Sequence, residues 1–210
     1  MLIPWVRKAM PTQQRRFFLF DCETTGLPRT RSFSIDDVEG WPRLVQVAWG
    51  RFDSRGNAEE AACHIIRPDG FRIPADATKI HGITQARALR AGRELGDVLD
   101  EFLGAAEKPG MILVAHNLAY DFGVIGAELV RTGKPLRFLD IPGICTMRTT
   151  TEICRLPRPG GFGFKWPTLE ELHVHLFGCA YEGAHDAAHD LEACARSFFR
   201  LWQAGHYPTL

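Results

Sequence analysis

The pattern of apolar and polar positions predicts strands in the first third of the chain. The run Phe-Phe-Leu-Phe at 17–20 has the length and composition of a buried strand. Segments 43–52 and 58–67 also have strand character, and the turn sequence Asp-Ser-Arg-Gly-Asn separates them. We therefore expect three consecutive strands, the last two joined as a hairpin, at one side of a sheet.

Helical spacing of apolar residues dominates the rest of the chain. Helices are expected at 84–91, 92–106, 118–131, 143–155, 168–177 and 186–204, and short strands at 111–115 and 136–141. Asn117 and Thr168 stand at N-cap positions, and Thr168 with Glu171 has the spacing of a capping box. Strands followed by alternating helices and strands predict a mixed α/β sandwich.

Length and composition indicate an ordinary globular protein. The 210 residues favour one large domain, which we place at 15–206. Residues 1–14 lack the apolar region of a secretion signal and are expected to form a loose N-terminal arm. The chain is 45% hydrophobic and 24% charged, and no apolar run approaches the ~20 residues that a membrane span needs.

Net charge and cysteine usage bear on the ligands and the cellular compartment of the protein. The 25 basic and 25 acidic residues cancel, so the net charge does not indicate nucleic-acid binding, and any such binding is expected to be local. The six cysteines are scattered without a C-x-x-C pair, and free thiols in a reducing cytoplasm are the simplest account of them. We therefore expect a cytoplasmic protein.

Two carboxylates follow the first apolar run. Residues two apart in a strand point to the same face, so Asp21 and Glu23 share a face beside the core. Desolvated like charges raise each other's pKa unless a cation compensates them, which indicates a divalent-metal site. The alternative is a strand that ends in solvated acids at the turn that follows, Thr24-Thr25-Gly26.

Two further acids occupy the apolar faces of helices. Asp121 lies on the apolar stripe of the helix at 118–131, and Asp190 on that of the helix at 186–204. Each stands in a first turn, where the helix dipole alone also accounts for an acid. Together with Asp21 and Glu23 they form four core-facing acids. Such oxygen ligands suit Mg²⁺ or Mn²⁺, and a cage for two such ions is suited to phosphodiester displacement.

A histidine precedes the last helix. If Asp186 is the N-cap, His185 lies in the preceding loop, free to lean over the acids and take a proton from water. The segment His185-Asp186-Ala187-Ala188-His189 is similar to the zinc-protease motif H-E-x-x-H, but that interpretation leaves the other acids unexplained. His116 is expected to order the turn between strand and helix.

The order and spacing of these residues resemble those of the DEDDh-type 3′–5′ exonucleases. This family includes the proofreading subunit of bacterial replicative DNA polymerases, ribonuclease T and oligoribonuclease. The resemblance rests on four motifs: Asp21-Cys22-Glu23-Thr24-Thr25-Gly26-Leu27, His81-Gly82-Ile83-Thr84, His116-Asn117-Leu118-Ala119-Tyr120-Asp121, and His185-Asp186-Ala187-Ala188-His189-Asp190. It implies an α/β, ribonuclease-H-like fold with a five-stranded mixed β-sheet flanked by α-helices.

The resemblance also implies the chemistry. Asp21, Glu23 and Asp190 would hold one ion, and Asp21 with Asp121 a second, the two being Mg²⁺ or Mn²⁺. His185 would deprotonate the attacking water, and the product would be a nucleoside 5′-monophosphate. The expected function is 3′–5′ hydrolysis of single-stranded nucleic acid, with DNA favoured over RNA.

Substrate contacts are implied in the same way. The backbone at Thr24 and Thr25 and the side chain of Leu27 would face the terminal nucleotide. Residues from His81 to Thr84 would line its pocket, and Asn117 is assigned to substrate binding as well. Two alternatives stay open: a catalytically silent binding or interaction module on the same fold, and a phosphoesterase of very short oligonucleotides.

Several features depart from the family pattern. Cys22 stands where Thr or an aliphatic residue is more usual, and the loop at 27–42 is longer than a minimal enzyme needs. No long tail follows the last helix, so a segment tethering the chain to a polymerase is not evident, and association with one is left open. The loop at 156–167 interleaves basic and aromatic residues; it suits base stacking on a single strand, or is a mobile solvent loop.

Overall fold

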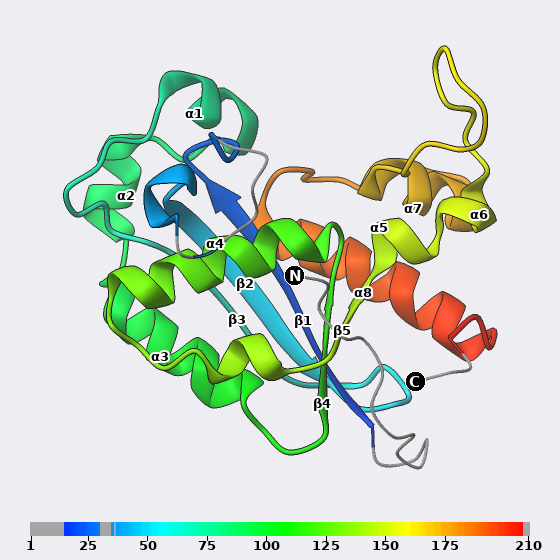
Figure 1. Ribbon diagram of the computed structural model, residues 1–210, viewed down its shortest axis with the longest axis horizontal. Helices are drawn as coiled ribbons and strands as arrows, with labels where there is room; N and C mark the ends of the chain where they lie inside the picture. Colours follow the sequence, from blue (N-terminus) through cyan, green and yellow to red (C-terminus); the bar gives the residue numbers. More distant parts are fainter. Residues whose placement is uncertain (1–14, 30–34, 36, 208–210) are drawn as a thin grey trace.

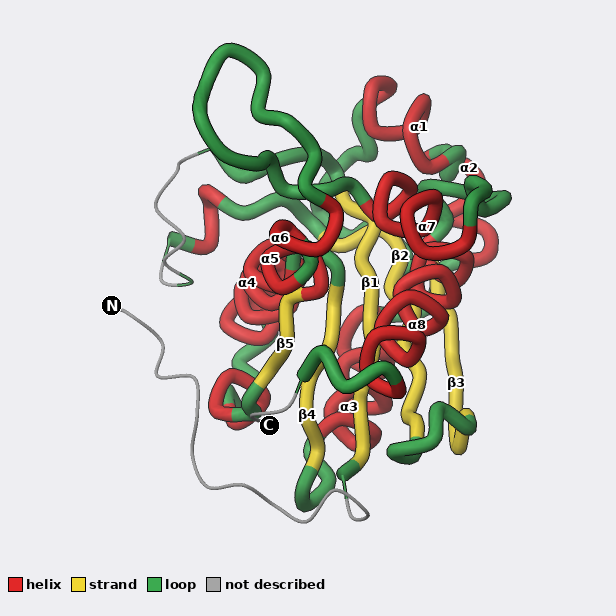
Figure 2. Tube along the Cα trace, turned by 90° about the vertical axis from the view of Figure 1, so that its right-hand side faces the viewer, coloured by secondary structure: helices red, strands yellow, loops and turns green. Residues whose placement is uncertain are grey.

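A computed structural model describes residues 15–29, 35 and 37–207, and these residues build one mixed sheet covered by helices (Figures 1 and 2). The strands are β1 (Arg16–Thr24), β2 (Leu44–Phe52), β3 (Ala58–Ile65), β4 (Met111–Ala115) and β5 (Gly143–Cys145). Their order is β3-β2-β1-β4-β5. The pairs β1–β2 and β2–β3 are antiparallel, whereas β1–β4 and β4–β5 are parallel. The predicted five-stranded mixed sheet is confirmed, with β1 at its centre.

Helices cover both faces of this sheet. They are α1 (Ala75–His81), α2 (Gln85–Ala91), α3 (Leu95–Ala106), α4 (Leu118–Arg131), α5 (Thr146–Thr149), α6 (Thr151–Cys154), α7 (Leu169–Phe177) and α8 (Ala187–Gln203), with 3-10 turns η2 (Val38–Gly40) and η3 (Arg137–Asp140). Because side chains alternate along β1, Phe18 and Phe20 pack in the core beneath α3 and α4, and Phe17 and Leu19 pack beneath α8. The buried run from Phe17 to Phe20 is thus fixed from both sides, which gives the end of β1 a defined position.

The bounds of several elements agree with the sequence pattern. The helix predicted at 118–131 is α4 itself. Thr168 and Glu171 form the predicted capping box of α7, each side chain bonding to the other's backbone N–H. Asp186 is the N-cap of α8, with its side chain accepting from the backbone of Ala188.

Other assignments are wrong. The strand predicted at 136–141 is the 3-10 turn η3, and β5 lies further on, within the segment predicted as a helix at 143–155. A Cβ on Gly143 would lie 2.6 Å from Leu118 Cδ2, so close packing against β4 and α4 selects this short strand. The helix predicted from 92 begins at Leu95, because Arg93 pairs with Ile66 beside the sheet. Helix α1 was not predicted.

The remaining expectations concern the N-terminal arm, the loop at 27–42, the cysteines and membrane spans. The predicted arm at 1–14 lies outside the described residues, as do 30–34 and 36 of the predicted loop at 27–42. All six cysteines are free, as expected. None of the described helices is both long enough and apolar enough to cross a membrane.

Candidate active site

The site is built on the end of β1, where the strand carries Asp21 and Glu23 on one face. Burial and the charges of Asp121, Asp190 and Glu23 raise the pKa of Asp21 well above its usual range. Burial and the charges of Asp190 and Asp186 raise the pKa of Glu23 from an ordinary 4.5 to about 7. The strand therefore delivers two carboxylates to a place where each destabilises the charged form of its neighbours.

Asp121 comes from the first turn of α4 and is only 3% exposed. The backbone N–H of Cys22 donates to its Oδ1 at 3.1 Å, which ties α4 to β1 between the two strand acids. Burial raises the pKa of Asp121 well above its usual range, although this backbone hydrogen bond opposes the shift. The apolar stripe of α4 thus holds a carboxylate against β1, as its helical spacing predicted.

Asp190 comes from the first turn of α8 and is held by two donors. The hydroxyl of Tyr181 donates to its Oδ1 at 2.7 Å, and the backbone N–H of His185 lies 3.2 Å from its Oδ2. Burial raises the pKa of Asp190 above its usual range. These contacts fold the segment before α8 back over the carboxylate.

His185 lies in that segment, one residue before the N-cap. Its φ of 68° is in the left-handed region, a strained conformation for a residue with a Cβ. The strain positions an exposed imidazole at the edge of the acids: ligand atoms of His185, Glu23 and Asp190 all lie within 4.8 Å of one another. Because His185 precedes α8, it shares no helical face with His189, and the zinc-protease interpretation does not hold.

The donor set fits a divalent metal ion. The charges that shift the pKa of Asp21 are those of four carboxylates, and that of Asp186 is the weakest of them. No positively charged side chain is among the groups that shift the pKa of Asp21. Carboxylate oxygens are the ligands of hard divalent cations, and such an ion would compensate the repulsion that raises these pKa values. The described part of the chain therefore contains a carboxylate cluster suited to metal binding.

Sequence reasoning missed one polar support of this cluster. Gln46 on β2 is 3% exposed; its amide NH₂ donates to Asp186 Oδ2 at 3.3 Å, and its carbonyl accepts from the backbone N–H of Ala187 at 3.1 Å. It thereby fixes the start of α8 beside β1. The signal in the sequence was a glutamine inside an apolar strand, where a polar side chain needs a partner.

The turn after Glu23 is held by its own side chains. Thr24 Oγ1 and the hydroxyl of Tyr120 lie 2.5 Å apart, and both donate to the carbonyl of Gly26. Thr25 Oγ1 accepts from the backbone N–H of Arg43 at 2.9 Å. The threonine hydroxyls are therefore engaged within the protein, whereas the side chain of Leu27 is 82% exposed beside the site.

The predicted residues of the second motif separate in the structure. His81 ends α1 and is buried; its Nδ1 accepts from the backbone N–H of Ile83 at 3.0 Å. Burial, mainly, and more weakly the nearby charge of His185 lower the pKa of His81. Thr84 instead caps α2 through the backbone N–H of Arg87. The structure brings His81 to the site and uses the Thr84 hydroxyl in a helix cap.

The third motif forms the turn between β4 and α4, in which His116 and Asn117 make different contacts. Asn117 is the N-cap of α4, as predicted, but its φ is 69° and its side chain makes no capping hydrogen bond. His116 lies within hydrogen-bonding distance of Thr146 Oγ1 and the carbonyl of Pro167, both at 3.0 Å. Burial lowers its pKa to about 4. The expected structural role of His116 agrees with these contacts.

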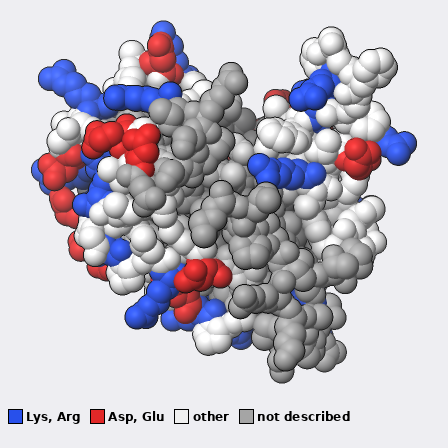
Figure 3. Space-filling view, viewed as in Figure 1, with Lys and Arg blue, Asp and Glu red and all other residues white. Residues whose placement is uncertain are grey.

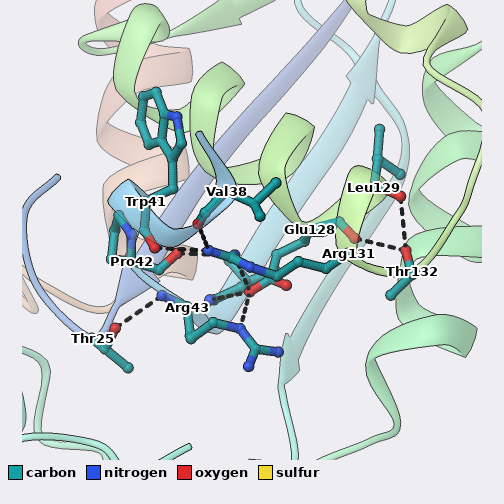
Figure 4. A network of polar contacts seen from close by, with 10 residues as sticks. Thr25, Val38, Trp41, Pro42, Arg43, Glu128, Leu129, Arg131 and Thr132 are labelled. Carbon is teal, nitrogen blue, oxygen red and sulfur yellow. Dashed lines mark hydrogen bonds and ion pairs between the residues drawn. The ribbon is translucent and has the colours of Figure 1, made fainter. Parts of the chain in front are cut away.

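A second buried carboxylate lies two turns further along α4. Glu128 is fully buried, and its Oε1 accepts from Arg43 Nε and from the backbone N–H of Leu44, both at 2.9 Å (Figure 4). Arg131 forms an ion pair with the same oxygen at 3.3 Å and donates to the carbonyls of Val38 and Trp41. This network anchors the start of β2, and through Arg43 the turn at Thr25.

Comparisons with known proteins agree with this geometry. The exonuclease family RNase_T matches residues 18–198. A DNA polymerase III subunit epsilon-like protein of Rhodobacter capsulatus is 30% identical over 92% of this chain and 25% of its own length. The PolC-type DNA polymerase III of Streptococcus agalactiae is also 30% identical, over 90% of this chain and 11% of its own length. The chain thus spans a quarter or less of these relatives.

Solved structures share the fold. Exonuclease I aligns with a TM-score of 0.72 and 22% identity over 90% of this chain and 41% of its own. E. coli exonuclease I in complex with a dT13 oligonucleotide aligns with a TM-score of 0.72 and 22% identity over 91% of this chain and 42% of its own. The four motifs thus lie on the fold that the resemblance implied, and the chain belongs to the RNase_T exonuclease family.

Proposed function

We propose that this chain is a metal-dependent 3′–5′ exonuclease of single-stranded nucleic acid that releases nucleoside 5′-monophosphates. The observation that supports this most directly is the buried carboxylate cluster around Asp21, with an exposed imidazole whose nitrogen lies within 4.8 Å of Glu23 and Asp190 oxygens. Buried acids that repel one another are costly in an apo protein, so their presence favours a role in binding metal.

The residues divide into ligands and a base. Asp21, Glu23 and Asp190 would hold one ion, and Asp21 with Asp121 a second, each Mg²⁺ or Mn²⁺. Two such ions supply charge stabilisation for the attacking and leaving oxygens of a phosphodiester. His185 would accept the proton of the attacking water, and its backbone hydrogen bond to Asp190 keeps the ring at the edge of the cluster.

The substrate would enter over the turn after β1. Leu27 presents an exposed apolar side chain to the terminal nucleotide, and the backbone at Thr24 and Thr25 faces it. His81 and Thr84 would line the nucleotide pocket, and Asn117 would contact the substrate as well. A pocket of about 540 Å³ adjoins this turn, and its lining includes four arginines: Arg29, Arg43, Arg72 and Arg131. We favour DNA over RNA, since the structural relatives include exonuclease I bound to a DNA oligonucleotide.

The names of the relatives suggest a second question, whether this chain assembles with a DNA polymerase. The epsilon-like and PolC-type relatives are named for DNA polymerase III, and this chain spans a small share of each. Co-purification with a polymerase subunit would support such an assembly.

The deciding experiment digests 5′-labelled single-stranded DNA and RNA oligomers with Mg²⁺ or Mn²⁺, with and without chelator. A metal-dependent ladder that shortens from the 3′ end supports the proposal. Binding without turnover would instead support a silent binding module. Turnover confined to the shortest oligomers would support a phosphoesterase of very short oligonucleotides, an alternative that the balanced net charge leaves open.

A further inference from the structure

The segment between α6 and α7 forms a projecting hairpin, which we call the hairpin arm (residues 155–167). The backbone N–H of Lys165 donates to the carbonyl of Leu156 at 2.9 Å, and that of Arg158 to the carbonyl of Gly163 at 3.2 Å. Pro157 and Phe164 form an antiparallel bridge. The arm therefore presents its side chains on a hydrogen-bonded frame.

The arm exposes aromatic surface. Phe162 at its tip is fully exposed, and Trp166 on its return leg is 58% exposed. Of the large apolar side chains exposed in the described residues, the two aromatic ones both belong to this arm. Two guanidinium groups lie over its rings: Arg148 over Trp166 at 5.6 Å, and Arg155 over Phe164 at 5.7 Å. Flat rings with adjacent cations favour a planar, anionic ligand.

The charge of the arm differs from that of the whole chain. Its thirteen residues include Arg155, Arg158 and Lys165 and no acid, although basic and acidic residues balance over the full sequence. Figure 3 shows Lys and Arg side chains on the lobe that projects at the upper right. Basic groups interleaved with exposed aromatics are the features of single-strand binding surfaces, where bases stack and phosphates are neutralised.

The base of the arm is tied to the active site. Pro167, at its end, contacts His116 through its carbonyl at 3.0 Å, and His116 lies between β4 and the helix that carries Asp121. Figures 1 and 2 both show the arm projecting past the end of the sheet at which β1 terminates. A strand whose 3′ end lies at the acid cluster therefore has this arm within its reach.

We propose that the hairpin arm binds the single strand upstream of the scissile bond. Phe162 and Trp166 stack on bases, and Arg158 neutralises a phosphate. The inference rests on the proposed function for the direction of the strand, and it assigns the arm to affinity and not to chemistry. It follows that long oligomers use the arm and the shortest ones do not.

The test measures anisotropy of 5′-fluorescein oligothymidylates of about three and about 15 nucleotides, with Ca²⁺ in place of the catalytic metal. Phe162→Ala and Trp166→Ala are each expected to weaken binding of the long oligomer about tenfold and to leave the short one unchanged. Arg158→Ala should lower the slope of log affinity against log salt by about 0.7. Trp166→Phe keeps a stacking surface and should retain most of the affinity.

Leu136→Ala provides the control, because Leu136 is 40% exposed and lies before β5, away from the arm. It should bind both oligomers as the wild type does. Since Phe162 and Trp166 are exposed, their variants should also keep the wild-type melting temperature. Unchanged affinity for the long oligomer in both aromatic variants would overturn the proposal, as would equal losses on both lengths. Unchanged affinity would leave the arm free for a protein partner.

Turnover separates this inference from the function on which it rests. On long oligomers the aromatic variants should raise KM with kcat unchanged. If the wild type shortens no oligomer while the variants lose affinity for the long one, the proposed exonuclease activity fails and the arm remains a nucleic-acid site. If the wild type is active and the variants match it in KM, the arm is wrongly assigned and the exonuclease activity stands.

Discussion

Helix α4 carries two buried carboxylates in opposite surroundings. Asp121, in its first turn, faces other acids, and burial raises its pKa. Glu128, two turns later, is fully buried but shares one oxygen with Arg43 and Arg131 (Figure 4). Both positions are inaccessible and ionisable, yet only one has cations of the protein itself. The difference separates an acid that completes a fold from one that requires an added cation.

This comparison gives the acid cluster a measurable signature. A structural carboxylate stabilises the apo protein, so its removal should lower the free energy of unfolding. A carboxylate kept for metal binding destabilises the apo protein, so its removal should stabilise the chain and abolish function. The predictions below test this contrast and the chemistry of the cluster.

Asp21→Asn should have the largest effect. We expect turnover of labelled oligomers to fall at least about a thousandfold, because several kcal/mol of charge stabilisation depend on this ligand. Thermal unfolding in chelator should show equal or higher stability, since one repelling charge is removed. Asp97→Asn, at an exposed acid of α3, should leave both unchanged. Substantial metal-dependent cleavage by the Asp21 variant would contradict its role as a shared ligand.

His185→Ala should slow the chemical step by roughly 10²–10⁴, the usual contribution of a general base. Single-turnover rates near neutral pH provide the measurement, and the melting temperature should stay close to the wild-type value. His189→Ala is the matched control, because this neighbouring histidine lies on α8 and contacts Asp186 at 3.6 Å. Equal rates for the His185 variant and the wild type would remove His185 from the role of base.

Glu128→Ala should act on stability. Loss of this carboxylate leaves the guanidinium groups of Arg43 and Arg131 without their shared partner, which costs about 3 kcal/mol of unfolding free energy. Urea unfolding measures this cost, and metal affinity of the folded protein should be unaltered. Glu94→Ala breaks an exposed pair with Arg67 and should cost less than about 1 kcal/mol. A Glu128 variant as stable as the wild type would erase the contrast on α4.

The pH dependence of stability should have a definite sign. An acid whose pKa is raised on folding binds its proton more tightly in the folded state, so its contribution is present below the unfolded pKa. Without metal, stability should therefore fall as the pH rises from about 4.5 through about 7, the ordinary and folded pKa values of Glu23. Asp21, Asp121 and Asp190 shift in the same direction.

Metal should reverse this loss. At about 100 times its Kd, a bound ion adds about 2.7 kcal/mol, and the gain should be larger above pH 7, where the ligands are ionised. Melting curves across this range, with Mg²⁺ or with chelator, provide the measurement, and Asp21→Asn should flatten the chelator series. Stability that rises with pH in chelator would contradict the raised pKa values.

The sequence determined the positions whose signal is local. The apolar run before Asp21, the spacing of Glu23, and the acids on two apolar helix faces were sufficient to indicate one cluster, since period and burial fix which way a side chain points. The capping box at Thr168 and the bounds of α4 followed for the same reason. These features depend only on residues a few positions away, so they can be read from the sequence.

Tertiary structure decided what depends on distant partners. The strand at Gly143–Cys145 exists because it packs against β4, and nothing within those three residues distinguishes it from a helix start. Only the fold revealed that Gln46 holds the N-terminus of α8. It also revealed that, on the same helix, Asp121 faces other acids whereas Glu128 faces an arginine. A residue's sequence spacing gives its direction, whereas the partner that it meets, and hence its energy, comes from chain segments far away in sequence.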